Sequence, residues 1–228
     1  MADWPKFICL RTRESSSLPI LSHLEFHLRL VPGYTMVQPL LEAVALRQWR
    51  RHRRPPAPRS VKAAMIRRFA DPGGRAVFVE TGTFFGDMLV ALRGDFERLY
   101  SIELHQGLGQ RAARRFAKDP NITIVVGDSG QELEPLLRVL GQPAVLWLDG
   151  HYSGFLTARG EGDTPILREL DSVFRGGTVH DVVLVDDARL FGTNPAYPTL
   201  AEIERRVRMA RPDWIVRVED DIVQMHAA

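Results

Sequence analysis

Cysteine is nearly absent from this sequence of 228 residues, which contains a single one, Cys9. One cysteine cannot form a disulfide within the chain, and it cannot build a zinc site from thiolates. No apolar run approaches the roughly 20 residues that a membrane-spanning helix requires. The N-terminus also lacks the apolar segment and small-residue cleavage site of a signal peptide. We therefore expect a cytoplasmic protein with no membrane partner.

Neither sign of charge dominates, since 30 lysines and arginines face 28 aspartates and glutamates, for a net charge of +2. The balance gives no overall case for a nucleic-acid or membrane partner. The apolar fraction of 45% and charged fraction of 25% are ordinary for a globular protein. The length suits one α/β domain with an extension.

The first 60 residues form the predicted extension. Residues 36–54 have the amphipathic pattern of a helix, with Val37, Leu40, Leu41, Val44 and Trp49 on one face. Its end is rich in arginine (Arg47, Arg50, Arg51, Arg53, Arg54), and the prolines from Pro55 onward must stop it. The arginines indicate either an anion or nucleic-acid patch, or a solvated face with favourable charge at a helix C-terminus. We expect residues 1–60 to be a helical extension that caps a pocket or pairs two subunits of a homodimer.

Residues 61–228 alternate strand and helix. Strands are predicted near 77–80, 99–104, 122–126, 143–148, 182–185, 214–218 and 222–226, with helices between them. This alternation predicts an α/β protein with a Rossmann-like, doubly wound, mainly parallel seven-stranded sheet and helices on both faces. The two strands closest together, at the end of the chain, suggest an antiparallel pair at one edge.

A glycine loop follows the first of these strands. Residues 77–92 predict a strand ending in Glu80, a loop with Gly82 and Gly86, and a helix. Glycine allows a ligand to approach bare backbone in such a loop. The spacing is E-x-G-x-x-x-G, and it is not the G-x-G-x-x-G that nicotinamide enzymes use to hold phosphates.

Acidic and polar residues end the next two strands. Glu103 lies about 20 residues beyond the glycine loop, where a carboxylate can accept both hydroxyls of a ribose. Asp128 and Ser129 follow the third strand, where they can meet an adenine amino group. Each acid alone is more often a helix cap or a loop residue.

Together these motifs resemble those of class I S-adenosylmethionine-dependent methyltransferases, over residues 76–228. The resemblance implies a pocket for S-adenosylmethionine lined by Glu80, Thr81, Gly82, Thr83, Gly86, Glu103, Asp128 and Ser129.

Three carboxylates and an imidazole follow the fourth and fifth strands. Asp149, His151, Asp186 and Asp187 should meet at one edge of the sheet, and a divalent cation would relieve their repulsion. Oxygen ligands favour Mg²⁺, which lowers the pKa of a bound hydroxyl. The pattern resembles the metal site of catechol-type and sugar-type O-methyltransferases, and by that match the metal ligands are Asp149, Asp186 and Asp187.

Catechol-type enzymes place a lysine three residues after the acid of the fourth strand, where this chain has Tyr152. We therefore assign catalysis to His151, as general base, and Asp149. The alternatives are that His151 only bonds a neighbouring loop, and that Asp186 contacts substrate or caps a helix without metal. The long segment 153–164 fits a loop that closes over substrate.

The sequence thus predicts a methyltransferase that uses S-adenosylmethionine and a divalent metal, Mg²⁺, to methylate a hydroxyl of a small molecule or glycan. One alternative is an RNA methyltransferase guided by the arginine-rich segment, whose affinity would fall steeply with salt. The other is a binding protein that keeps the fold without turnover.

Overall fold

The structure is a computed structural model that describes residues 34–70, 76–150 and 164–228. It divides into two compact units, residues 1–44 and 45–228. Helix α2 (Tyr34–His52) confirms the helix expected around residues 36–54. In the first unit its apolar side chains are exposed, among them Met36 and Leu40, whereas Trp49 in the second unit is buried.

The second unit contains a seven-stranded sheet. Its strands are β1 (Val77–Thr81), β2 (Arg98–Glu103), β3 (Ile122–Val126), β4 (Ala144–Leu148), β5 (Val182–Val185), β6 (Trp214–Glu219) and β7 (Ile222–Ala227). Their order across the sheet is β3-β2-β1-β4-β5-β7-β6. Every residue of β1, β4 and β5 is buried, as the continuous apolar runs of a central parallel strand require.

Strands β1 to β5 are parallel, and β7 is antiparallel to both of its neighbours. The sequence-based prediction of a mainly parallel, doubly wound sheet with an antiparallel edge pair is therefore confirmed. The chain order reverses between β1 and β4, because β1 continues to β2 on one side and β4 lies on the other. In such sheets, ligands bind beyond the carboxyl ends of the strands at this reversal.

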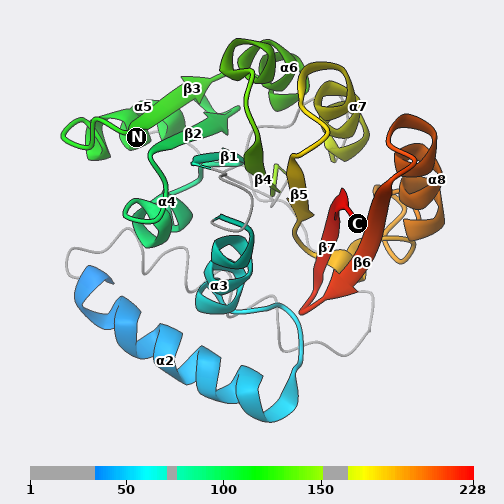
Figure 1. Ribbon diagram of the computed structural model, residues 1–228. Coiled ribbons are helices and arrows are strands. Elements are labelled where there is room, and N and C mark those ends of the chain that lie inside the picture. The colour runs from blue at the N-terminus through cyan, green and yellow to red at the C-terminus, as the bar shows by residue number, and fades with distance from the viewer. Residues whose placement is uncertain (1–33, 71–75, 151–163) are drawn as a thin grey trace, which may run out of the picture. The chain divides into compact units, whose positions relative to one another are not determined.

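Helices cover both faces of the sheet (Figure 1). One apolar core joins the sheet to α6, α7 and α8, and the other joins it to α3, α4 and α5. Their bounds are α3 (Arg59–Ala70), α4 (Asp87–Leu92), α5 (Gln106–Arg115), α6 (Ser129–Leu140), α7 (Ile166–Gly176) and α8 (Leu200–Ala210), and a short 3-10 helix, η1 (Ala188–Leu190), follows β5.

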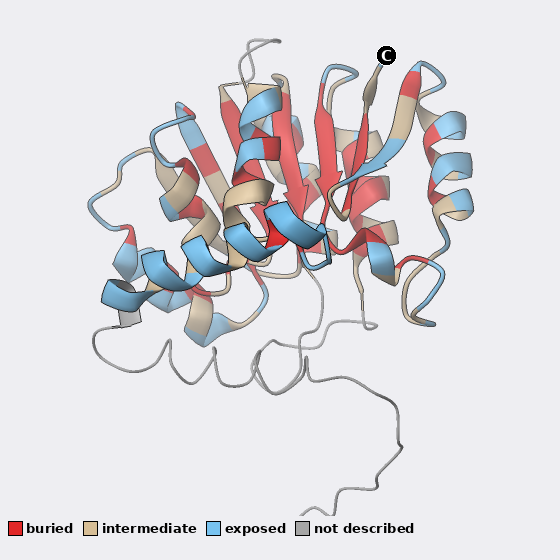
Figure 2. Cartoon of the chain, turned by 90° about the horizontal axis from the view of Figure 1, so that it is seen from below, coloured by how far each residue is buried: buried red, intermediate tan, exposed pale blue. Residues whose placement is uncertain are grey.

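Helices α3 to α8 each bury one side in these cores and turn the other to solvent (Figure 2). Apolar residues at helical spacing, such as Ile166, Leu170 and Val173 in α7, form the buried side. No helix in the three described ranges is long and apolar enough to cross a bilayer.

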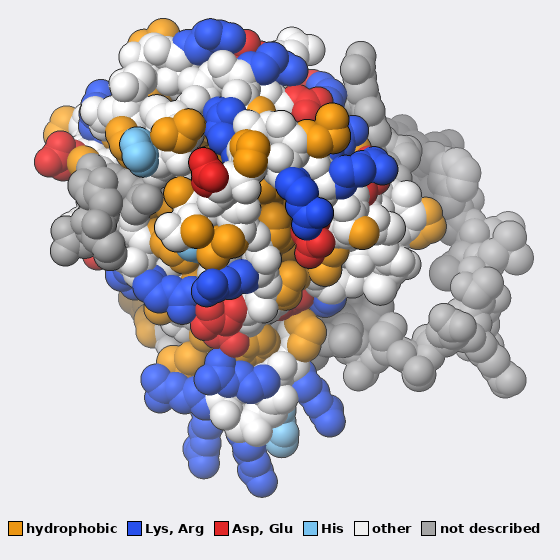
Figure 3. All heavy atoms as spheres, turned by 45° about the vertical axis from the view of Figure 1, so that its right-hand side comes forward, with side chains coloured by type: hydrophobic (Ala, Val, Ile, Leu, Met, Phe, Trp, Pro, Cys, Tyr) orange, Lys and Arg blue, Asp and Glu red, His pale blue; other side chains and the backbone are white. Residues whose placement is uncertain are grey.

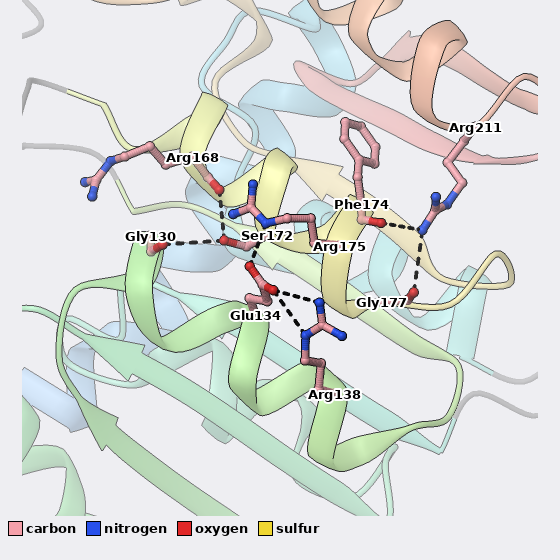
Figure 4. Close-up of polar contacts among 9 residues, drawn as sticks. All are labelled: Gly130, Glu134, Arg138, Arg168, Ser172, Phe174, Arg175, Gly177 and Arg211. Atoms are coloured by element: carbon pink, nitrogen blue, oxygen red, sulfur yellow. Dashed lines mark hydrogen bonds and ion pairs between the residues drawn. The ribbon is translucent and has the colours of Figure 1, made fainter.

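Helix α7 is fixed against α6 by polar contacts and by a close approach of the two backbones (Figure 4). The Ser172 hydroxyl hydrogen-bonds the Arg168 carbonyl at 2.9 Å and lies 3.4 Å from the Gly130 carbonyl oxygen. Glu134 accepts from Arg175 at 2.6 Å and from Arg138 at 2.9 Å. A Cβ on Gly176 would lie 2.7 Å from the Glu134 carbonyl oxygen, so only glycine fits there. These contacts fix the C-terminal half of α7 against α6.

Candidate active site

Four of the candidate residues lie in one row at the carboxyl edge of the sheet. Thr81 pairs with Ile102 and with Leu148, and Leu148 pairs with Val185. The residues that follow these positions therefore lie next to one another across four parallel strands. They are Gly82, Glu103, Asp149 and Asp186.

The glycine loop packs closely against the end of β4. Gly82 has a φ of 81°, and its N–H donates to the Ile102 carbonyl at 2.9 Å. A Cβ at this position would lie 2.6 Å from the carbonyl oxygen of Asp149, a contact that no side chain permits. Gly86 has a φ of 74°, and a Cβ at this position would lie 2.6 Å from the Phe116 ring. Both glycines are thus required by backbone conformation and close contact.

Glu80 is buried beneath this loop, with 2% of its surface exposed. The Ser101 hydroxyl donates to Glu80 Oε1 at 2.7 Å, so the Thr83 hydroxyl, 2.5 Å from Ser101 Oγ, must donate to Ser101. Burial raises the pKa of Glu80 to about 8, against the opposing effect of the Ser101 hydrogen bond. The structure therefore places Glu80 as a support for the loop through Ser101, a residue that the sequence analysis did not single out.

Glu103 joins the glycine loop to the start of α5. Its Oε2 accepts from the Phe84 N–H at 2.8 Å, and its Oε1 accepts from the His105 N–H at 2.9 Å. His105 in turn caps α5 by accepting from the Leu108 N–H at 3.2 Å. Each carboxylate oxygen can accept a second hydrogen bond, so Glu103 is held in place and keeps capacity for ligand hydroxyls.

Asp128 caps α6 and is bound by an arginine of α7. Its carboxylate accepts from the Gly130 N–H at 2.9 Å and forms two contacts with the Arg168 guanidinium, at 3.0 and 3.3 Å. A Cβ on Gly130 would lie 2.7 Å from Arg168 Nη1, so the absence of a side chain there lets Arg168 reach Asp128. The next residue, Ser129, is buried. Asp128 is thus both a helix cap and one half of an ion pair.

Glu169 is a buried acid that the sequence analysis missed. It is 1% exposed, and its Oε1 has no hydrogen-bond partner within the described part of the chain. Burial raises the pKa of Glu169 to about 7, opposed by the hydroxyls of Ser129 and Thr81, while the charge of Asp149 raises it further. A Cβ on Gly150 would lie 2.8 Å from Oε1. The sequence did contain a signal for Glu169, because it is an acid on the apolar side of α7, beside Ile166 and Leu170.

Asp149 begins the loop after β4. Its N–H lies 3.2 Å from the Thr81 hydroxyl oxygen and 3.3 Å from the Thr81 carbonyl oxygen. These contacts tie the ends of β1 and β4 together. His151, with the rest of residues 151–163, falls outside the described residues, and so does most of the predicted loop 153–164.

The two aspartates after β5 are engaged by cations. Asp186 Oδ1 accepts from the Asp187 N–H at 2.8 Å, and Oδ2 is bound by the ammonium of Lys62 from α3. Asp187 Oδ1 lies 2.7 Å from Nη1 of Arg189, which also pairs with Asp221. The sequence analysis singled out neither Lys62 nor Arg189.

The charges in this cluster shift pKa values in both directions. Burial raises the pKa of Asp186 to about 7, the charge of Asp149 adds to the rise, and Lys62 opposes it. Burial lowers the pKa of Lys62, but the charges of Asp186, Asp149 and Asp187 outweigh this and raise it overall. The lysine therefore stays protonated at neutral pH. Burial raises the pKa of Tyr197, and the same three carboxylates raise it further.

The donor set does not fit a divalent metal in this arrangement. Both oxygens of Asp186 have partners, and Asp187 is paired with Arg189. Among the described residues, no group of three or more acidic, histidine or cysteine side chains is arranged to hold a metal ion. The predicted magnesium site, Asp149 with Asp186 and Asp187, thus finds no support in the part of the chain that the structure describes.

One arginine of the arginine-rich segment and one of α3 are paired with acids of β6 and of the turn that follows it. Arg53 Nη1 lies 2.9 Å from Asp220 Oδ1, and Arg68 Nη2 lies 2.8 Å from Glu219 Oε2. These pairs border a pocket of about 540 Å³ whose lining includes the buried Trp49. Figure 3 shows acidic side chains among the basic ones over the upper part of this face, whereas at its lower end Lys and Arg side chains gather beneath a single acidic patch. The ion pairs thus reduce, without removing, the basic surface that a phosphate backbone would favour.

No protein-family model matches the sequence, and no curated protein does. Solved structures do match its fold. The methyltransferase PaMTH1 from Podospora anserina, bound to S-adenosylhomocysteine, has a TM-score of 0.52 and 12% identity, over 96% of this chain and 100% of that one. A candidate caffeoyl-CoA O-methyltransferase from Staphylococcus aureus has a TM-score of 0.51 and 11% identity, over 93% and 100%.

A third similar structure is the O-methyltransferase TomG from Streptomyces achromogenes, in complex with S-adenosylmethionine. It has a TM-score of 0.50 and 20% identity, over 72% of this chain and 78% of that chain. At such identities the likeness concerns the fold alone, because one fold hosts many functions. The chain has the Rossmann-like fold of class I methyltransferases.

Proposed function

We propose that this protein is an S-adenosylmethionine-dependent methyltransferase whose acceptor is a hydroxyl of a small molecule or glycan. The observation that carries the proposal is the position of Glu103. This buried carboxylate stands beside Gly82 at the strand reversal, held by two backbone N–H groups. A carboxylate fixed there suits the two hydroxyls of an adenosine ribose.

The residues around Glu103 fit the rest of the cofactor. The Gly82 loop offers bare backbone where any Cβ would collide with the chain. Ser129 stands at the end of β3, where the adenine would lie, and Asp149 stands at the end of β4, beside the loop. When bound, S-adenosylmethionine supplies an electrophilic methyl group on a sulfonium. This chain's residues would bind the ribose, orient the acceptor and receive its proton.

Support for a hydroxyl acceptor comes from the acids after β4 and β5. Asp149, Asp186 and Asp187 gather at these strand ends, where Lys62 contacts Asp186 and Arg189 contacts Asp187. Grouped carboxylates disfavour anionic acceptors such as phosphate groups, and they can receive the proton of a neutral hydroxyl. Divalent-metal assistance stays a prediction of the sequence.

The RNA alternative is less well supported than the small-molecule one. Two arginines within residues 47–59, the part of the chain that would carry it, form ion pairs with acids of this chain, namely Arg53 and Arg59. Binding that weakens steeply with salt would still favour RNA, because phosphate contacts release counterions.

Calorimetric titration of S-adenosylhomocysteine tests the proposal directly. We expect micromolar binding to the purified protein, both with Mg²⁺ and with EDTA. The Glu103→Gln variant should bind about tenfold more weakly or worse, a loss of about 1.4 kcal/mol or more. Glu97→Gln is the matched control, because Glu97 is an exposed acid just before the same strand. Absence of binding to the unaltered protein would refute the proposal.

Turnover separates an enzyme from a binding protein. Labelled S-adenosylmethionine is incubated with the protein and a panel of phenols, catechols and sugars, and label in the acceptor is measured. Transfer to a hydroxyl compound is expected. Tight binding of S-adenosylhomocysteine with no transfer to any acceptor class would favour the non-catalytic alternative.

A further inference from the structure

Lys62 reaches the acids at the ends of β4 and β5 from a helix distant in sequence. Its ammonium is bonded to Asp186 Oδ2, and the two residues are 124 positions apart. The side chain of Lys62 is 16% exposed and that of Asp186 is 2% exposed. The ammonium also lies 5.9 Å from the centre of the ring of Trp147, which is in β4 two residues before Asp149. The lysine therefore sits inside the acidic group, shielded from most of the solvent.

Helix α3 is held in place by contacts along its length, so the backbone of Lys62 has little freedom to move. Ala63 and Ile66 are fully buried in the core under this face of the sheet. Arg59, at the start of α3, pairs with Asp87 of α4 at 3.6 Å, and Arg67, in its last turn, pairs with Asp95 at 2.8 Å. Ion pairs near both ends and apolar contacts between them fix the helix against α4 and the sheet.

A divalent ion and the Lys62 ammonium would compete for the same oxygen. A metal bound by Asp149, Asp186 and Asp187 needs Asp186 Oδ2 or Oδ1, and these are held by Lys62 and by the Asp187 N–H. At close range a metal ion and an ammonium also repel each other strongly where little water screens them. To bind, the metal would have to displace the lysine.

We propose that Lys62 is the resident cation of this acidic group and excludes a divalent metal from it. The inference rests on the proposed methyl transfer for its chemical meaning. Lys62 provides the positive charge that the sequence analysis assigned to Mg²⁺.

The ammonium can serve methyl transfer in the way a metal would. An acceptor oxygen that binds Lys62 loses its proton more readily, because the positive charge stabilises the developing oxyanion. That oxygen forms the new bond to the methyl carbon while the carbon–sulfur bond breaks and its electron pair goes to sulfur. The acceptor's proton passes to the carboxylate of Asp149 and then to water. The ammonium keeps its own protons throughout.

Manganese binding tests the proposal without knowledge of the acceptor. Mn²⁺ is titrated into the full chain while the signal of the free ion is followed by electron paramagnetic resonance. The unaltered protein should show no saturable binding up to millimolar Mn²⁺. Lys62→Gln removes the ammonium and should bind Mn²⁺ saturably, with a Kd roughly tenfold or more below the millimolar limit set for the unaltered protein. Lys62→Arg keeps the charge and should again bind none.

Arg67→Gln is the matched control. It removes one positive charge from the same helix, where the arginine pairs with Asp95 at the surface. It should leave Mn²⁺ binding unchanged, so that any gain in Lys62→Gln is assigned to the site and not to net charge.

Two results would overturn the proposal. One is saturable Mn²⁺ binding by the unaltered protein that Asp186→Asn abolishes, a comparison that decides the matter even if Lys62→Gln does not fold. The other is a folded Lys62→Gln variant, judged by circular dichroism, that gains no affinity. S-adenosylhomocysteine is titrated into the same samples, so that failure of cofactor binding and failure of the lysine inference are read separately.

Discussion

The carboxyl edge of the sheet has two halves that hold their acids in different ways. In the cofactor half, at the ends of β1 and β2, Glu80 and Glu103 accept hydrogen bonds from hydroxyl and backbone N–H groups. In the acceptor half, at the ends of β4 and β5, Asp186 and Asp187 are paired with Lys62 and Arg189.

The two kinds of partner have different effects, because one sets the orientation of a carboxylate and the other changes the charge of the site. Neutral donors fix the orientation of a carboxylate and leave it able to accept hydrogen bonds from ligand hydroxyls. Cations cancel part of its charge, so that a second cation gains less by binding there. The cofactor half is thus suited to recognising a ribose, and the acceptor half carries its counter-charge within the fold.

The largest effect that would separate the two halves is expected from Asp186→Ala. Loss of this carboxylate leaves the shielded Lys62 ammonium without its direct partner, which should lower the free energy of unfolding by about 3 kcal/mol. Urea denaturation followed by tryptophan fluorescence measures the loss. Affinity for S-adenosylhomocysteine should stay within a few-fold, because the cofactor half is untouched.

Asp95→Ala provides the comparison for that loss. Asp95 also pairs with a basic residue of α3, but at the surface, so its loss should cost only about 0–1 kcal/mol. Equal costs for the two variants would show that the lysine pair does not stabilise the acceptor half.

Gly82→Ala should have the opposite profile. Alanine in the left-handed conformation costs about 1–2 kcal/mol, and the collision of its Cβ with the Asp149 carbonyl oxygen adds to this. We expect the free energy of unfolding to fall by about 2 kcal/mol and binding of S-adenosylhomocysteine to be lost in calorimetry. Gly94→Ala is the control, since a Cβ on Gly94 meets no atom within 4 Å. Unchanged cofactor binding by Gly82→Ala would contradict the role of the loop.

The same contrast explains what could be predicted from the sequence. The parallel strands, the edge pair and the glycine loop follow from local patterns, because apolar runs, turns and glycines act on neighbouring residues. The acids at the strand ends could also be picked out, because parallel strands bring their carboxyl ends together.

The partners of those acids could not be predicted in the same way. Lys62 and Arg168 come from helices 124 and 40 residues away in sequence from Asp186 and Asp128. One lysine or arginine on a helix looks like any other until packing fixes its direction. The sequence predicts a metal for the acceptor half because nothing near Asp149, Asp186 and Asp187 in the sequence indicates that the fold brings Lys62 to them.

The prediction that sharpens the comparison most concerns the pH dependence of stability in the cofactor half. Burial raises the pKa of Glu80 from its ordinary value of 4.5 to about 8 in the folded protein. Between these values the folded state holds a proton that the unfolded state releases, so stability falls as pH rises through this window. Glu80→Gln removes the titrating group and keeps the shape. Its free energy of unfolding relative to the unaltered protein should therefore increase from pH 5 to pH 8 in urea titrations, whereas Glu97→Gln should show no such trend. A constant difference would mean that Glu80 is ionised in the fold, and that the cofactor half, like the acceptor half, contains charge that another group must balance.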